Sequence, residues 1–134
     1  MKSIMIFFSF FVVLTACNRP NTKIKEQISN ADSVAINYFK GDGTMDTVIA
    51  VKILKDKKIM DQLSSLISAS STGANIKCGY DGSLHFFKKN IVVQDIDFRM
   101  NDAECMYFSF KQEEKLAATV LSPEAKQLLE SIKK

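Results

Sequence analysis

The stretch IVVQDIDFRM, residues 91–100, carries the clearest structural pattern in the chain. Apolar and charged residues alternate along it, and successive side chains of a β-strand point to opposite faces. The apolar residues would share one face and the charged residues the other: Val92, Ile96, Phe98 and Met100 against Asp95, Asp97 and Arg99. The pattern predicts a sheet with one face packed on a core and the other face open to water.

Further strands are expected on both sides of this one. Short runs rich in β-branched and aromatic residues, bounded by turn signals such as Gly41-Asp42-Gly43, are typical of strands. The runs are 33–40, 47–54, 76–80, 83–88, 104–110 and 116–121. Because most of them follow one another through short turns, we expect hairpins and a mostly antiparallel sheet.

Two segments have the spacing of amphipathic helices. Asp56 is a favoured N-cap, and apolar residues recur at helical spacing between Ile59 and Ile67. A second helix is expected to begin at Ser122-Pro123, since serine caps well and proline suits the first turn. The order of the longer elements, β-β-α-β-β-β-β-α, predicts a two-layer α+β domain over residues 32–134, with both helices on one face of the sheet.

The first residues form a separate segment. Lys2 is the only charged residue before Arg19, and the run from Ile4 to Leu14 is apolar except for Ser9. This run is shorter than the about 20 apolar residues that a membrane-spanning helix needs. A positive charge followed by a short apolar run is typical of a secretory signal peptide.

The residues Leu14-Thr15-Ala16-Cys17 resemble the lipobox of bacterial lipoproteins. The resemblance implies that signal peptidase II removes residues 1–16 and that Cys17 is acylated. The polar composition of residues 17–31 predicts a tether, in which the spacing of Ile24 and Ile28 would also allow a short helix. Two or three acyl chains hold a protein firmly to a membrane. In that family, a residue other than aspartate after the cysteine, here Asn18, favours the outer membrane. We therefore expect a protein of the bacterial cell envelope whose lipid anchor binds the membrane and whose domain faces the periplasm.

An anchor at Cys17 leaves two of the three cysteines, Cys78 and Cys105. Export places them in an oxidising compartment, where a disulfide between them is the default. The rival interpretations are a metal-binding pair and a reactive thiol, and either could use the only histidine, His85. His85 lies among aromatic residues on an expected strand, where a structural role is commoner than a catalytic one.

Asp95 and Asp97 are the most suggestive pair of acids. Because they lie two positions apart on one strand, both carboxylates face the same side, where they could act as acid and base, hold a cation or form a solvated face. Arg99 continues the row and could neutralise them. Tyr107 is expected on the outer side of another strand. These four residues are the expected binding face.

The rest of the sequence favours no particular chemistry. It contains no nucleophile elbow, zinc-protease motif or P-loop, and we expect neither a cofactor nor a metal. A formal net charge of +3 does not indicate nucleic-acid binding. Segments 77–82 and 104–108 also resemble small Bacteroidota-type lipoproteins, a group that implies no named activity.

These patterns predict a non-catalytic binding module of the cell envelope. One alternative is an inhibitor or immunity lipoprotein that blocks an envelope-active enzyme. A further alternative is a thiol enzyme or metal carrier that uses Cys78, His85 and Cys105.

Overall fold

The computed structural model describes residues 19–41, 45, 47–74 and 78–134, so the lipobox lies outside the described residues. The helices are α1 (Thr22–Ser29), α2 (Lys57–Ser68) and α3 (Pro123–Lys133). The strands are β1 (Ser33–Phe39), β2 (Val48–Leu54), β3 (Ser71–Thr72), β4 (Gly82–Lys88), β5 (Ile91–Arg99), β6 (Tyr107–Gln112) and β7 (Lys115–Val120). None of the helices in these ranges is long and apolar enough to cross a membrane.

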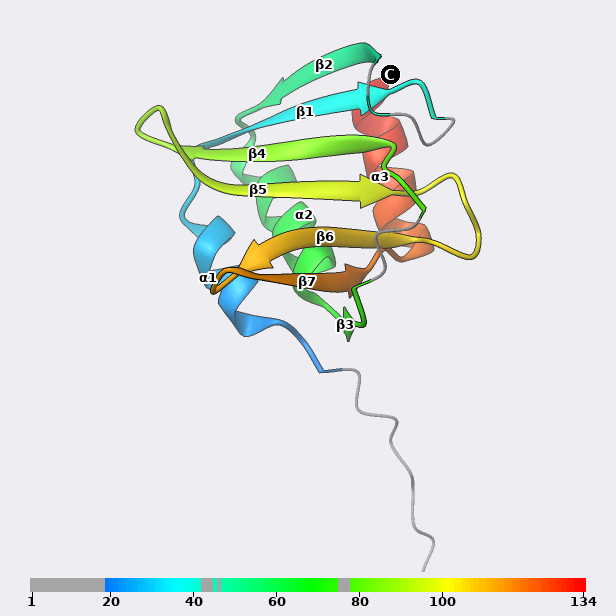
Figure 1. Cartoon of the computed structure of the whole chain (residues 1–134). Helices are drawn as coiled ribbons and strands as arrows, with labels where there is room; N and C mark the ends of the chain where they lie inside the picture. The colour runs from blue at the N-terminus through cyan, green and yellow to red at the C-terminus, as the bar shows by residue number, and fades with distance from the viewer. Residues whose placement is uncertain (1–18, 42–44, 46, 75–77) are drawn as a thin grey trace, which may run out of the picture.

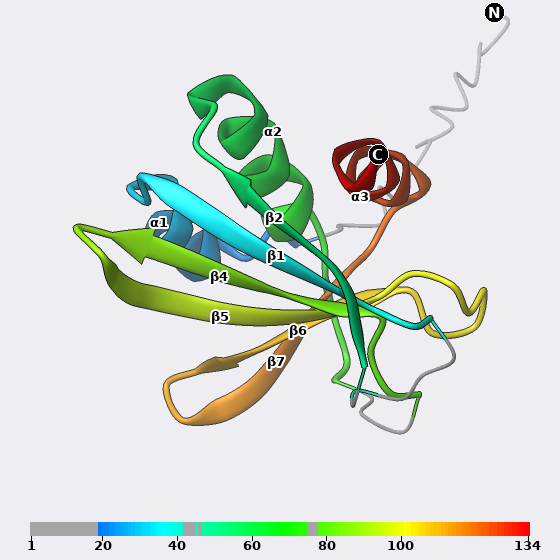
Figure 2. The ribbon, with the colours of Figure 1, turned by 90° about the horizontal axis from the view of Figure 1, so that it is seen from above.

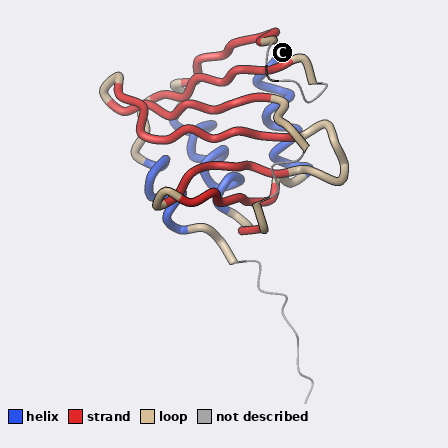
Figure 3. The backbone as a smooth tube through the Cα atoms, viewed as in Figure 1, coloured by secondary structure: helices blue, strands red, loops and turns tan. Residues whose placement is uncertain are grey.

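The seven strands form one antiparallel sheet in the order β2-β1-β4-β5-β6-β7-β3 (Figures 1 and 3). The helices lie on one face of this sheet (Figure 2). We call the opposite face, which none of these three helices covers, the open face. The arrangement confirms the predicted α+β architecture of an antiparallel sheet with helices on one side.

The core lies between the sheet and the helices. Its largest fully buried side chains come from all three helices and from the central strands, and include Tyr38, Phe86, Phe98, Phe108, Leu63 and Leu129. The Tyr38 hydroxyl donates to the Leu129 carbonyl at 2.7 Å, and burial raises the pKa of Tyr38 to about 12. Gly82 makes room for the neighbouring ring, because a Cβ at this position would lie 2.2 Å from Phe98 Cζ.

Helix α1 occupies most of the segment that was expected to be a tether. Asn21 caps it by accepting a hydrogen bond from the Ile24 amide, and Ile24 and Ile28 are buried in the core. Two isoleucines four positions apart form an apolar stripe on one side of a helix. An extended tether would leave both side chains exposed to water. The folded part of the chain therefore includes α1, and the domain begins earlier than residue 32.

Three local details differ from the predicted strands. The described part of the expected strand 76–80, from Cys78 to Tyr80, is irregular, and β3 lies in a segment expected to be a loop. Val92 was expected to point into the core, but it is exposed. A bulge between β4 and β5 changes the register next to Phe86, so Val93 packs against the core in place of Val92.

Candidate functional site

The sheet divides between β5 and β6. These strands pair only from Asp97 to Arg99, opposite Ser109 to Tyr107, whereas β5 pairs with β4 along its whole length. Beyond Asp97, towards the start of β5, the two strands separate. A strand edge that loses its neighbour must find other hydrogen-bond partners, and here glutamine side chains supply them.

Two glutamines hold the separated strands. Gln27 of α1 donates to the Val93 carbonyl at 2.7 Å, and Gln94 donates to the Lys111 carbonyl of β6 at 3.3 Å. Gln94 also donates to the carbonyl of Asp95 at 3.0 Å. Where the strands separate, glutamine side chains therefore provide hydrogen-bond donors for the carbonyls of Val93, Asp95 and Lys111.

On the open face, the separation produces a cleft of about 470 Å³. Val92, Phe110 and Leu116 supply apolar lining. The polar lining includes Asp95, Asp97, Gln94, Ser109 and Lys111. Apolar walls with a few convergent polar groups are characteristic of binding sites, so this cleft is the strongest candidate site among the described residues.

Asp97 is the most unusual residue of the cleft. It is half-buried, and its carboxylate makes no hydrogen bond or ion pair with the residues that the structure describes. Burial raises the pKa of the Asp97 carboxyl above its ordinary value, while His85 lowers it and the charge of Asp95 raises it. A partly desolvated carboxylate without a partner favours a ligand that supplies a positive charge or a hydrogen-bond donor.

A row of hydrogen-bonded polar side chains borders the cleft on the open face. His85 Nδ1 lies 2.6 Å from Asp95 Oδ1, and His85 Nε2 lies 3.1 Å from Ser83 Oγ and 3.3 Å from Asn37 Nδ2. An ionised carboxylate only accepts hydrogen bonds, so Nδ1 carries a proton, and Nε2 is the acceptor whenever the ring is neutral. The row fixes the His85 ring and holds the Asp95 carboxylate at the cleft.

The side chains of Ser83, His85 and Asp95 contact one another in the order serine, histidine, aspartate, as in a catalytic triad. Its surroundings differ from those of an acyl-transfer site, since Ser83 is only 7 % exposed and does not line the cleft. Asp97 pairs directly with Ser83 in the ladder, and its negative charge would oppose an oxyanion there. We therefore interpret the row as support for Asp95.

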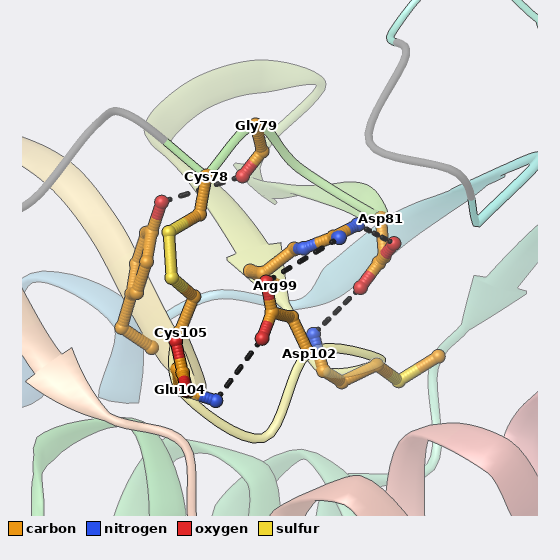
Figure 4. Close-up of a disulfide and its surroundings, with 9 residues drawn as sticks. Cys78, Gly79, Asp81, Arg99, Asp102, Glu104 and Cys105 are labelled. Atoms are coloured by element: carbon orange, nitrogen blue, oxygen red, sulfur yellow. Dashed lines mark hydrogen bonds and ion pairs between the residues drawn. A yellow bond between two sulfur atoms is a disulfide. The ribbon is translucent and has the colours of Figure 1, made fainter.

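A second polar cluster lies at the other end of β5, around Asp81 (Figure 4). Asp81 Oδ1 accepts from Arg99 Nη1 at 2.6 Å, and Oδ2 accepts from the Met100 and Asn101 amides at 2.7 and 2.8 Å. Asp81 is 1 % exposed and Arg99 is 9 % exposed. A buried carboxylate with a cation and two amide donors is fully satisfied, so this cluster serves the fold.

The disulfide joins the loops on either side of this cluster. Cys78 and Cys105 are bonded, with their Cα atoms 6.2 Å apart, which confirms the predicted pair. Cys105 N donates to the Asp102 carbonyl at 3.0 Å, and the Tyr107 hydroxyl donates to the Gly79 carbonyl at 3.3 Å. Burial raises the pKa of Tyr107.

The expected binding face therefore separates into two parts. Asp95 and Asp97 meet in the cleft, whereas Arg99 and Tyr107 pair with each other in the ladder beside the Asp81 cluster. Tyr107 is only 5 % exposed, so neither it nor Arg99 offers a free surface. The contact of Arg99 with Asp81 joins residues 18 positions apart, and alternation along one strand carries no information about it.

The three residues of the thiol hypothesis do not meet as a group. His85 contacts Asn37, Ser83 and Asp95, and the ligand atom that lies within 4.8 Å of both sulfurs belongs to Asp102. Asn37, Ser83 and Lys111 were not singled out from the sequence. Their only signal was alternation along strands. Ser83 and Lys111 lie on β4 and β6, the two neighbours of β5, and Asn37 lies one strand further away, on β1.

Comparisons of the chain with protein-family models, with curated proteins and with solved structures find no match.

Proposed function

We propose that this chain is a lipid-anchored protein of the bacterial cell envelope that binds a protein partner, without catalysis, through the open face of its sheet. The observation that carries the proposal is the cleft between β5 and β6, to which Asp97 contributes a half-buried carboxylate that makes no hydrogen bond or ion pair with the described residues. The fold does not need this carboxylate for any contact among the described residues. A carboxylate whose pKa is perturbed by burial in a cleft is characteristic of binding positions, which supports a ligand for Asp97.

The lining of the cleft defines the chemistry of the partner. Asp95 and Asp97 would accept hydrogen bonds from a lysine or arginine side chain, and a guanidinium could engage both carboxylates. Val92 and Leu116 at the rim would pack against the apolar part of that side chain. Lys111 on the β6 side repels a second cation, so the partner segment is expected to present one basic residue flanked by apolar ones.

The anchor is a separate part of the proposal, and it rests on the lipobox resemblance at Cys17. We expect cells that express the full chain to incorporate a labelled fatty acid into it, and a Cys17→Ser variant to take up none. Equal incorporation by both chains would contradict acylation at Cys17.

Photo-crosslinking tests the cleft itself. A photoreactive amino acid at Leu116, on the rim, should capture a partner in cells, whereas one at Gln62, exposed on α2, should not. Asp97→Asn should reduce capture from Leu116 on the order of tenfold, the equivalent of about 1.4 kcal/mol. The matched control is Asp61→Asn, which removes an exposed carboxylate paired with Lys57 on α2 and should leave capture unchanged.

The proposal fails on either of two results. Capture from Leu116 that does not exceed capture from Gln62 would show that the open face is not the binding surface. Capture that persists undiminished in Asp97→Asn would show that the carboxylate of the cleft does not contribute to binding.

A further inference from the structure

The two edges of the sheet differ in how they end. At one edge, β3 pairs with β7 through Ser71 and Thr72. At the other edge, β2 pairs with β1 on one side, and no further strand of the described residues pairs with its other side. Natural edge strands are commonly protected by proline, by several charges, by shortness or by a bulge. The seven residues of β2, VIAVKIL, contain no proline and a single charge, Lys52, and the bulge at Ile49 disturbs only one end of the strand.

The side chains of β2 that face away from the helices are strongly exposed. Val48, Ile49, Val51 and Ile53, which we call the β2 patch, are between 50 % and 62 % exposed. Val51 and Ile53 lie on the open face, since they pair with Asn37 and Ala35 of β1. Contiguous exposed aliphatic residues on an unpaired strand mark a surface that binds another strand.

From this edge we propose that β2 pairs antiparallel with β2 of a second copy of the chain, about a two-fold axis through Val51. Such pairing joins two seven-stranded sheets into one continuous sheet. The interface is isologous, because the same strand meets itself on both sides of the axis. This inference uses the edge of the sheet and is independent of the cleft.

The register follows from three physical conditions. An axis that passes between two residues would shift the register by one residue. It would then set open-face side chains of one copy opposite helix-face side chains of the other, which is disfavoured. An axis through Lys52 would set two lysines directly opposite each other, which is destabilising. An axis through Ala50 would set Lys52 opposite Val48, beyond the bulge at Ile49, and would restrict the ladder to residues 49–51.

An axis through Val51 meets all three conditions. It pairs Val51 with itself, Lys52 with the small Ala50, and Ile49 with Ile53, over residues 49–53. The bulge of β2 lies at Ile49, so Val48 and Leu54, which face opposite sides of the sheet, lie outside this ladder. Four half-exposed aliphatic side chains from each copy bury less than the roughly 1,200 Å² of a small stable interface, so we expect a weak dimer.

Disulfide trapping of the full chain in membranes tests both the dimer and its register. Val51→Cys should form a crosslinked dimer under mild oxidation, because directly opposite Cα atoms lie about 4.5 to 5.5 Å apart, within disulfide range. The matched control is Ile53→Cys, which is equally exposed but would face residue 49 of the second copy. Its dimer yield should be on the order of tenfold lower, because cysteines far apart cannot be bridged.

A mixture of Ile49→Cys and Ile53→Cys chains should restore the crosslink. The native Cys78–Cys105 bond, checked by thiol counting, and an unchanged circular dichroism spectrum would establish that each variant folds. Two results overturn the proposal. One is no dimer from folded Val51→Cys, including the case in which it crosslinks only to another protein. The other is a dimer from Ile53→Cys as abundant as that from Val51→Cys.

Discussion

Two aspartates of one sheet have opposite environments. Asp81, at the start of β4, is almost completely buried and accepts hydrogen bonds from Arg99, Met100 and Asn101. Asp97, on β5, is half-buried in the cleft and has no hydrogen-bond or ion-pair partner among the described residues. The charge of Asp81 is matched by a cation and two amides in direct contact, whereas Asp97 interacts with His85 only through space, without a hydrogen bond.

This difference distinguishes the structural role of Asp81 from the binding role that we propose for Asp97. A buried carboxylate with its donors in place is strongly coupled to stability, because removing it leaves a buried cation without a partner. A desolvated carboxylate without donors opposes folding at neutral pH, and stored cost of this kind is typical of functional positions. The comparison leads to three predictions, which differ in sign and size.

The largest effect is expected for Asp81→Ala. The substitution leaves the Arg99 guanidinium buried without its main partner, and the Met100 and Asn101 amides without an acceptor. We expect the free energy of unfolding to fall by about 3 to 5 kcal/mol. Urea unfolding of the chain from residue 17, carrying Cys17→Ser to prevent acylation, measures it at pH 7.

The matched control for this substitution is Asp61→Ala, which removes an exposed carboxylate paired with Lys57. Its effect should stay below about 1 kcal/mol, as for other exposed ion pairs. A loss for Asp81→Ala as small as that of the control would show that the Asp81 cluster does not hold the fold.

The second effect is expected for the double substitution Cys78→Ser, Cys105→Ser. The disulfide closes a loop with a sequence separation of 27 that contains Asp81 and Arg99. The chain-entropy account gives a loss of about 3 to 4 kcal/mol in the free energy of unfolding. Reduction of the unsubstituted chain should lower stability by the same amount in the same urea titration. If the free energy of unfolding falls in the double-serine chain but not in the reduced, unsubstituted chain, the entropic explanation is contradicted.

The architecture was largely accessible from the sequence. The alternation in 91–100 and the caps at Asp56 and Ser122 predicted strand β5 and helices α2 and α3, because these signals are local. The disulfide followed from cysteine count and an expected compartment. The strand order was not accessible, since the pairing of β1 with β4 joins segments far apart along the chain.

Only part of the candidate site could be predicted from the sequence. Asp95 and Asp97 could be placed on an outer face by their spacing, but the cleft beside them arises from the separation of β5 and β6, which no local pattern encodes. Arg99 shares that spacing and yet is buried, where it contacts Asp81 in the bend before β4. Periodicity assigns a side chain to a face, and only the tertiary structure decides whether that position is covered.

The smallest effect, and the only stabilising one, is expected for Asp97→Asn. The folded-state pKa of Asp97 is raised above its ordinary value of 3.8, so the protonated carboxyl favours folding below that value. This contribution is lost as the pH rises through the raised folded pKa, and at pH 7 the ionised group opposes folding. Asparagine removes that charge, and we expect a gain of about 0.5 kcal/mol at pH 7 that disappears in acid.

The free energy of unfolding of Asp97→Asn at pH 7, measured beside that of Asp81→Ala, therefore tests the central claim most directly. The account predicts that Asp97→Asn is at least as stable as the unsubstituted chain, because Asp97 is held for a ligand and contributes no contact to the fold. A loss of stability approaching that of Asp81→Ala would contradict the account, since it would mean that Asp97, like Asp81, is a structural residue.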